Sequence, residues 1–228
     1  MMNALIIMSK APIPGLAKTR LKCILSDDEC ANLQIAMLKD LFLTTEKLKN
    51  HLDIFLFYTP NEYFDLMKKL SPDYIKLYPQ QGETIGDRMY NSAEFILQKY
   101  DKVLIIGSDV PEITSEVILD SFDKLKRYDI VIGPTYDGGY YLIGLKKIKK
   151  QIFNNEIRWG CESVFESTLN YIKECSLSYE LVPKCYDIDT KEDLIEFFKR
   201  NSKYLMAKNT YKFILSIGGK NGKKFNDK

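Results

Sequence analysis

Short apolar runs alternate with longer amphipathic stretches along most of this chain. The apolar runs have the length and composition of buried strands, and they predict strands at residues 4–8, 53–58, 75–78, 103–106, 130–133, 140–145 and 179–182. The stretches between them predict helices at residues 27–49, 61–69, 85–99, 115–126, 162–173 and 191–200. Such alternation is typical of an α/β domain whose mostly parallel sheet is covered by helices on both faces.

The pattern changes after Asp129, where two predicted strands are separated only by residues 134–139. A parallel pair needs a longer crossover than this, so we expect antiparallel pairing and a mixed sheet. We assign residues 1–202 to a single domain. Residues 203–228 are expected to form a C-terminal helix and then, from Gly218, a frayed basic tail.

Two helix starts carry capping signals. Ser26 is followed three residues later by Glu29, and Thr190 is followed by Asp193. A hydroxyl with an acid at this spacing satisfies free N–H groups at a helix start. We therefore expect helices to begin directly after Ser26 and Thr190.

Composition limits the classes of protein that this chain can belong to. It has 228 residues, 45% of them hydrophobic, enough for one sizeable core. A net charge of +2 argues against a nucleic-acid partner. Five cysteines without a CxxC pair fit a reduced, cytoplasmic protein. We expect no signal peptide and no membrane span, and the single histidine, His51, disfavours a histidine-based mechanism.

The strongest functional signal directly follows the first predicted strand. This loop is stiffened by Pro12 and Pro14, and it carries four cations, which are Lys10, Lys18, Arg20 and Lys22. Ligands of open α/β sheets bind at the carboxyl ends of strands. Cations at that edge favour an anion, above all a phosphate chain.

Asp109 follows another apolar strand and lies just before Pro111, which cannot donate to a continuing strand. A carboxylate facing a phosphate loop can hold Mg²⁺ (or Mn²⁺), since Mg²⁺ prefers one or two carboxylates with phosphate oxygens and water. The alternative is a turn or helix cap. Because Thr114 and Ser115 are better placed as caps, we favour the metal role for Asp109.

A second acidic pair, Asp187 and Asp189, flanks Ile188 just before the last predicted helix. In an extended segment both carboxylates share one face. Either could supply a second metal ligand, and the sequence leaves this choice open. In the alternative interpretation, Asp189 only supports the helix N-terminus.

Residues 81–89 form a glycine-containing turn that leads into a helix. The amide of Gln81 has both donors and an acceptor, as recognition of a base edge requires. Gly82 lets a ligand approach the backbone closely. Arg88 either reaches a phosphate or pairs with its neighbour Asp87.

The loop at residues 133–141 contains Asp137-Gly138, a strong turn dipeptide. A plain hairpin turn competes here with an acceptor-binding loop in which Asp137 orients or deprotonates a hydroxyl. Trp159 could stack on a sugar, although packing is the commoner role of such a residue. The candidate acceptor-binding residues are Asp137, Gly138, Gly139, Tyr140 and Trp159.

Several motifs in this order resemble a bacterial family of glycosyltransferase-A-like (GT-A-like) proteins, long classed as a domain of unknown function and including arsenosugar-biosynthesis-type glycosyltransferases. The motifs are Lys-Ala-Pro-x-Pro-Gly-x-x-Lys-Thr-Arg-Leu (10–21), Gln-Gly-x-x-x-Gly-x-Arg-Met (81–89), Gly-Ser-Asp-x-Pro (107–111), Asp-Gly-Gly-Tyr-Tyr-Leu-Ile-Gly-Leu (137–145) and Asp-Ile-Asp-Thr-x-Glu-Asp-Leu (187–194). The layout is also similar to phospholactate and molybdenum-cofactor guanylyltransferases.

The resemblance implies a single-domain GT-A or nucleotide-diphospho-sugar transferase fold. It implies nucleotide phosphates at Lys18 and Arg20, and a divalent metal at Asp109 with Asp187 or Asp189. The predicted nucleotide-binding residues are Lys10, Ala11, Pro12, Gly15, Lys18, Arg20, Gln81, Gly82, Arg88 and Ser108. The predicted catalytic residues are Lys18, Arg20, Asp109 and Asp137.

Two transferase reactions fit these motifs. Our main expectation is a metal-dependent glycosyltransferase that uses a nucleoside diphosphate sugar, with uracil as the first guess, and a small-molecule hydroxyl. The alternative is a nucleotidyltransferase that uses a nucleoside triphosphate and a phosphorylated acceptor and releases pyrophosphate. A catalytically inactive nucleotide-binding module is the third possibility. The first two share the donor half of the site and differ in the acceptor pocket, so the sequence separates them poorly. The base, the sugar, the acceptor and the oligomeric state stay open.

Overall fold

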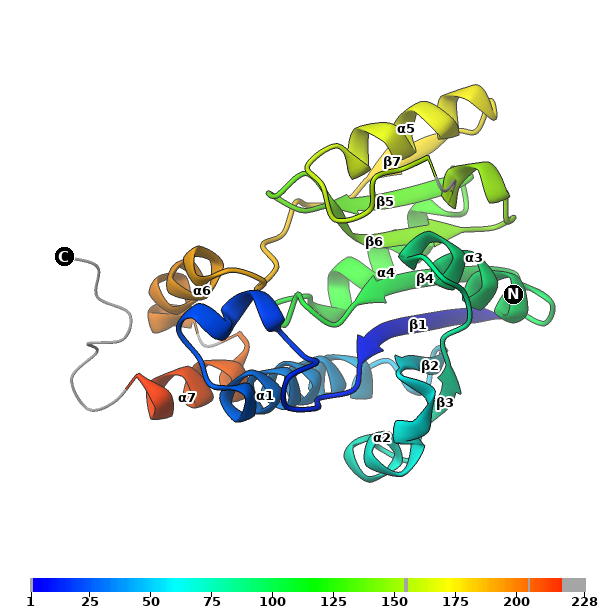
Figure 1. The fold of residues 1–228 in the computed structure, drawn as a ribbon. Helices are drawn as coiled ribbons and strands as arrows, with labels where there is room; N and C mark the ends of the chain where they lie inside the picture. Colours follow the sequence, from blue (N-terminus) through cyan, green and yellow to red (C-terminus); the bar gives the residue numbers. More distant parts are fainter. Residues whose placement is uncertain (1, 154–155, 205, 219–228) are drawn as a thin grey trace.

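One mixed sheet organises the computed structural model, which describes residues 2–153, 156–204 and 206–218 (Figure 1). Its strand order is β3-β2-β1-β4-β6-β5-β7. The strands are β1 (Asn3–Lys10), β2 (Asp53–Thr59), β3 (Ile75–Pro79), β4 (Lys102–Gly107), β5 (Ile130–Pro134), β6 (Tyr140–Leu145) and β7 (Tyr179–Leu181). Strand β6 runs antiparallel to β4 and β5, and the other neighbours pair in parallel. The predicted mixed, mostly parallel sheet is confirmed.

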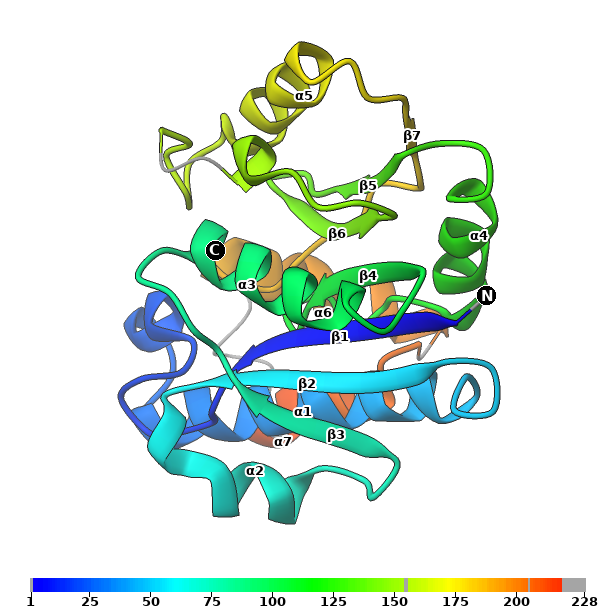
Figure 2. The same ribbon diagram turned by 90° about the vertical axis from the view of Figure 1, so that its right-hand side faces the viewer.

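Helices cover both faces of this sheet (Figure 2). They are α1 (Asp27–Glu46), α2 (Phe64–Leu70), α3 (Ile85–Leu97), α4 (Ser115–Lys124), α5 (Val164–Glu174), α6 (Lys191–Tyr204) and α7 (Lys208–Ile217), with short 3₁₀ turns η1 (Thr19–Cys23), η2 (Asn61–Tyr63) and η3 (Lys150–Phe153). Helices α1, α2 and α4 pack on one face, and α3 and α5 on the other. Helices α6 and α7 form an outer layer over α1.

Alternation along the strands builds the two main cores. Leu5 and Ile7 of β1 face α1 and α4, whereas Ala4 and Ile6 face α3 and α5. This is the period-two arrangement expected of a strand buried on both faces. The apolar runs of the sequence are therefore continuous because both sides of each strand need cover.

The outer layer is fixed by a buried carboxylate. Asp40, on α1, accepts hydrogen bonds from the backbone N–H groups of Asn209 and Thr210 at 2.9 and 2.8 Å. It also accepts from the side chains of the same two residues. Asp40 thus satisfies the free N–H groups at the start of α7, and it joins α7 to the helix that carries part of the site.

Both predicted caps are present. Ser26 Oγ accepts from Glu29 N at 3.2 Å, and Glu29 Oε2 accepts from Ser26 N at 2.8 Å. Asp193 Oδ2 accepts from Thr190 N at 2.7 Å and from Asp189 N at 3.1 Å. The second cap therefore fixes the backbone of Asp189 as well as the start of α6.

Element bounds differ from the expected ones mainly at helix ends. Helix α1 stops at Glu46 rather than at residue 49, because the following N–H groups bond three residues back, as Leu48 does to Thr45. Helix α6 continues to Tyr204, and the C-terminal helix begins only at Lys208. Residues 219–228, where we expected a frayed tail, lie outside the described residues. None of the described helices combines the length and apolar character of a membrane span.

Candidate active site

A cavity of about 290 Å³ lies where β1, β2, β3 and β4 end. Its wall is formed by Met8, Ser9, Lys10, Lys18, Thr19, Arg20, Gln34, Thr59, Gln80, Ile85, Arg88, Ser108, Asp109 and Asp189. The four strands are mutually parallel, so their carboxyl ends share one edge. This is the edge at which open α/β sheets bind ligands.

Lys18 is the centre of the cavity wall. Its side chain is only 3% exposed, and its Nζ donates to Asp109 Oδ1 at 2.5 Å and to Asp189 Oδ1 at 3.0 Å. The third donor bond goes to the carbonyl of Ile188 at 2.7 Å. All three ammonium protons are therefore used, and they bring together segments 91 and 171 residues away in sequence.

Charge balance explains why an ammonium group is stable at this buried position. Burial lowers the pKa of Lys18, but the carboxylates of Asp109 and Asp189 outweigh it, so its pKa is raised and it stays charged. In turn the Lys18 ammonium holds the pKa of Asp189 below its usual range. Asp189 is therefore a permanent carboxylate at neutral pH.

Asp187 has a different environment from Asp189. Burial, together with the charges of Asp137 and Asp189, raises the pKa of Asp187 to about 7. Asp187 is thus close enough to feel the charges of both Asp137, in the 133–141 loop, and Asp189, which is bonded to Lys18. The structure places Asp189, not Asp187, beside Asp109 on the shared ammonium.

The two carboxylates on Lys18 suit a metal that arrives with phosphates. The side chain of Asp109 is 42% exposed and that of Asp189 is 34% exposed, so each can offer oxygen to the cavity. Within the described part of the chain, no group of three or more His, Cys, Asp or Glu side chains could hold a metal ion. The donor set therefore fits Mg²⁺ completed by phosphate oxygens and water, rather than an all-protein metal site.

The other predicted cations divide into two groups. Lys10, Arg20 and Arg88 line the cavity. Arg20 has a 58% exposed side chain and lies 3.9 Å from Asp189 Oδ2, and Arg88 Nε donates to the carbonyl of Gly82 at 3.0 Å. Lys22 instead pairs with Asp27 at 2.8 Å and is not among the residues that form the cavity wall.

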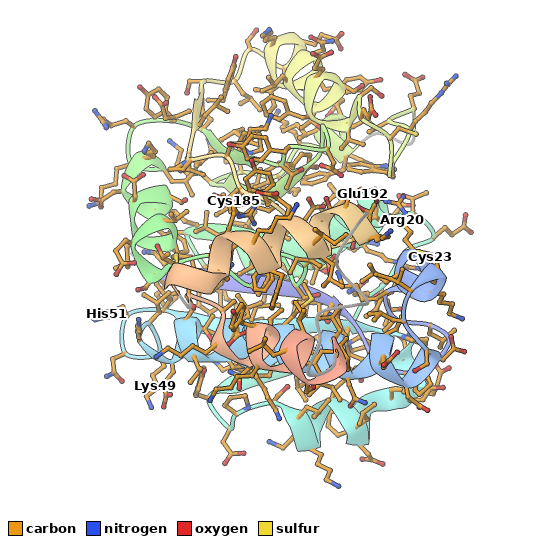
Figure 3. The ribbon with its side chains drawn as sticks, turned by 90° about the vertical axis from the view of Figure 1, so that its left-hand side faces the viewer. Arg20, Cys23, Lys49, His51, Cys185 and Glu192 are labelled. Atoms are coloured by element: carbon orange, nitrogen blue, oxygen red, sulfur yellow. The ribbon has the colours of Figure 1, made fainter. Side chains whose placement is uncertain are left out.

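Arg20 also shows where the cavity lies in the molecule. Figure 3 shows Arg20 near Glu192 at the start of α6, with η1 beside that helix. His51 lies at the opposite end of the molecule. The single histidine is therefore remote from this cavity.

Predicted nucleotide contacts occupy several different places. Ser108 lines the cavity. Gln81 and Gly82 are not among the described residues of the cavity wall, and they border a shallow groove beside the cavity instead. Ala11 packs in the core, and its N–H donates to Thr59 O at 2.8 Å. Pro12 is buried, and Gly15 has a φ of 85° in the turn before η1.

The sequence interpretation missed Gln34, Gln80 and Ser9, which all line the cavity. Gln34 of α1 donates to Ser9 Oγ at 3.2 Å and to Ser108 Oγ at 2.8 Å. Gln80 lies on the cavity wall next to Gln81. Gln34 interrupts the buried face of α1, and a polar residue at a core position is a signal that could have identified it.

The predicted acceptor residues pack closely together. Asp137 Oδ1 accepts from Thr135 Oγ1 at 2.5 Å and from Gly139 N at 3.0 Å, so it holds its own turn. Gly138 has a φ of 90°, and a Cβ there would lie 2.1 Å from Glu162 O. Only glycine fits this position.

Trp159 packs against the start of α3. A Cβ on Gly86 would lie 2.6 Å from Trp159 Cζ2, and the Trp159 ring meets Tyr140 edge-on with centroids 6.5 Å apart. Trp159 and Tyr140 both border the core beneath α3 and α5. These two aromatic residues therefore support the loops around the acceptor side.

Comparison with known proteins places the chain among transferases. Residues 43–161 match the family described as "Uncharacterized protein conserved in bacteria (DUF2064)". This chain belongs to the DUF2064 family. A curated relative, the 2-phospho-L-lactate guanylyltransferase of Methanocaldococcus jannaschii, is 33% identical over 201 residues, which cover 85% of this chain and 81% of the relative. The expected family resemblance is confirmed, and this DUF2064 protein is a transferase of the nucleotidyltransferase-like kind.

Solved structures agree on the fold of this DUF2064 protein. A protein of Desulfovibrio desulfuricans G20, provisionally named a nucleotide-diphospho-sugar transferase, matches with a TM-score of 0.89 at 28% identity over 100% of both chains. The 4-diphosphocytidyl-2C-methyl-D-erythritol synthase of Anaerococcus prevotii gives 0.59 at 14% identity, over 89% and 96% of the two chains. Rv0371c of Mycobacterium tuberculosis, solved with manganese, gives 0.51 at 11% identity, over 87% and 99%. The last two support the fold alone.

Proposed function

We propose that this protein is a cytoplasmic, metal-dependent nucleotidyltransferase that joins a nucleotide to a phosphorylated small-molecule acceptor and releases pyrophosphate. The observation that carries the proposal is the cavity lined by Lys10, Arg20 and Arg88 and ending at the carboxylates on Lys18. So many cations suit a triphosphate better than a diphosphate. The name of the M. jannaschii relative supports the same reaction. We therefore prefer nucleotidyl transfer to the sugar transfer that was our main expectation.

In the proposed reaction, a phosphate oxygen of the acceptor attacks the α-phosphorus of the nucleoside triphosphate. A P–O bond forms to the acceptor, the bond from the α-phosphorus to the α,β-bridging oxygen breaks, and pyrophosphate leaves with that electron pair. The protein needs to supply little covalent chemistry. Positioning and charge neutralisation provide most of the rate.

The side chains divide this work among them. Lys10 and Arg88 would hold the phosphates of the nucleotide, and Arg20 the phosphate of the acceptor. Lys18 has all its protons engaged, so it orients Asp109 and Asp189. A Mg²⁺ (or Mn²⁺) ion held by these two carboxylates would neutralise charge on the phosphates and polarise the α-phosphoryl group.

The acceptor is expected beside the 133–141 loop. A phosphorylated acceptor is already anionic, so Asp137 has no proton to remove and instead shapes the turn. The neighbouring carboxylates would repel such an acceptor unless a cation intervenes. Arg20, mostly exposed and 3.9 Å from Asp189, is placed to supply that charge.

Pyrophosphate release is the decisive test. With Mg²⁺, a nucleoside triphosphate and 2-phospho-L-lactate or another phosphorylated hydroxy acid, we expect release that depends on the acceptor. Asp109→Asn should reduce it by about 100-fold without unfolding the protein, whereas Lys22→Ala should retain it, because Lys22 pairs with Asp27 outside the cavity wall.

The same assay examines the second candidate, sugar transfer, which the provisional name of the D. desulfuricans protein favours. Slow hydrolysis of a sugar nucleotide to free sugar and diphosphate, without pyrophosphate from any triphosphate, would replace our proposal with that candidate. If neither nucleotides nor sugar nucleotides raise the melting temperature with metal present, both enzyme functions are wrong.

A further inference from the structure

Gln80 is held in a single orientation at the end of β3. Only 7% of the residue is exposed, and its Nε2 donates to the main-chain carbonyls of Ser9 at 3.1 Å and Phe57 at 2.8 Å. Both partners are carbonyl oxygens, which can only accept. The NH₂ group must therefore face them, and both of its protons are used.

The side-chain oxygen of Gln80, Oε1, is available to a ligand. Among the described residues no group donates a hydrogen bond to Gln80 Oε1. This oxygen is also not fully buried, because it is absent from the buried polar atoms that lack a partner. Gln80 lines both the cavity and the groove beside it. The side chain therefore presents to this space an atom that can accept a hydrogen bond, and no donor.

The polar residues near Gln80 also use their side-chain protons in hydrogen bonds within the protein. Gln34 donates both amide protons to Ser9 Oγ and Ser108 Oγ, and Ser9 Oγ donates to the carbonyl of Lys10 at 2.9 Å. The cations Lys18 and Arg20 lie on the cavity wall with the carboxylates. The amide protons of Gln80 and Gln34 are thus all engaged, and Arg88, which lines the cavity and the groove together with Gln80, donates its Nε–H to the carbonyl of Gly82.

We infer that Gln80 selects the base of the nucleotide, accepting hydrogen bonds from the adjacent N1–H and N2–H₂ donors of guanine. This inference rests on the proposed function. Guanine is the base whose edge offers two neighbouring donors. In adenine and cytosine an acceptor nitrogen adjoins the single amino group, and in uracil carbonyl oxygens flank the lone N–H. The free acceptor of Gln80, with no donor on the same side chain, therefore favours guanine most and uracil least.

Nucleotide analogues test this inference on the unaltered protein. Dissociation constants would be measured with Mg²⁺ for GTP, ITP, N1-methyl-GTP, UTP and inorganic tripolyphosphate. We expect GTP to bind at least about tenfold more tightly than UTP. ITP, which lacks the 2-amino group, should fall between them, and N1-methyl-GTP should approach UTP. Tripolyphosphate measures the phosphate site without any base.

A variant then assigns the selectivity to Gln80. Gln80→Leu should bring GTP affinity down to that of UTP while the affinity for tripolyphosphate stays within about twofold of the unaltered protein. The matched control is Gln98→Leu, at an exposed position at the end of α3, which should keep the full preference. If Gln80→Leu fails to fold, because two carbonyls lose their donors, the analogue series still decides.

The outcomes separate this inference from the proposed function. If tripolyphosphate and every triphosphate fail to bind, the proposed nucleotidyl transfer and the base assignment are both wrong. If the triphosphates bind but GTP has no advantage over UTP, only the base assignment is wrong. Loss of the preference in Gln81→Leu but not in Gln80→Leu would also overturn it, and would assign the base to the groove beside the cavity.

Discussion

The two halves of the sheet edge differ in how completely their polar groups are paired. In the donor half, strands β1 to β4, Lys18 and Gln80 each have every side-chain proton engaged by the protein itself. In the acceptor half, strands β5 to β7 and their loops, burial and neighbouring charges raise the pKa of Asp187 to about 7. The donor half is therefore preorganised, whereas the acceptor half has excess negative potential that a cation or a substrate must compensate.

We expect the acceptor half, rather than the donor half, to decide which reaction is catalysed. In the proposed function, the hydrogen-bonded donor half would fix the position of the nucleotide, whichever acceptor is used. The acceptor half holds its turn through Asp137, Thr135 and Gly139. Function in such folds is set by the site and its loops rather than by the scaffold.

Replacing Lys18 should break the donor half most severely. In Lys18→Met, Asp109 and Asp189 lose their shared ammonium and repel each other, so we expect a loss of about 1,000-fold in pyrophosphate release. Stability should fall by about 2 kcal/mol, less than for a fully buried pair because both carboxylates are partly exposed. Activity assays and urea unfolding measure the two effects.

A second buried lysine offers a matched control for this variant. Lys102 of β4 is 4% exposed, and its Nζ donates only to the carbonyl of Phe122 among the described residues. Burial lowers the pKa of Lys102. Because Lys102 is not among the described residues of the cavity wall, Lys102→Met should keep full activity. Wild-type activity in Lys18→Met would show that the carboxylate pair needs no internal cation.

Substitution of the carboxylates should sharpen the comparison between Asp189 and Asp187. We expect Asp109→Asn and Asp189→Asn each to reduce Mg²⁺-dependent nucleotide binding and activity by about 100-fold, because each removes a charge facing the phosphates. Asp187→Asn should reduce activity by less than about fivefold, since that carboxyl is only partly ionised at neutral pH. Isothermal titration with and without Mg²⁺ measures this, and equal losses in all three variants would contradict it.

The sequence predicted the sheet better than the site, for physical reasons. Runs such as Leu5 to Ile7 are apolar because both faces are covered, so strands are visible locally. The contact of Lys18 with Asp189 spans 171 residues and depends on the strand order, which local patterns do not encode. The step from Gln81 to Gln80 is the hardest case, because side chains of an extended chain alternate in direction. Gln80 lines both the cavity and the groove, whereas Gln81 borders the groove and is not among the described residues of the cavity wall.

A weaker effect is expected where the acceptor half rests on the donor half. Trp159→Ala removes the ring that packs on Gly86, and we expect stability to fall by about 2 kcal/mol. The KM for the acceptor should rise by about tenfold while the KM for the nucleotide stays unchanged. Gly86→Ala should produce the same pattern, since its Cβ would lie 2.6 Å from the Trp159 ring. An increase in the nucleotide KM alone would assign Trp159 to the donor half.

The smallest effect should distinguish two cations of the same loop. Arg20 is 58% exposed beside Asp189, and Lys22 is paired with Asp27. Arg20→Ala should raise the acceptor KM by about fivefold, as expected for one solvent-screened ionic contact, and this loss should grow at low salt, where screening is weaker. Lys22→Ala should change the KM by less than about twofold. Steady-state kinetics at two ionic strengths would measure both, and equal effects of the two variants would mean that general loop charge, rather than the position of Arg20, attracts the acceptor.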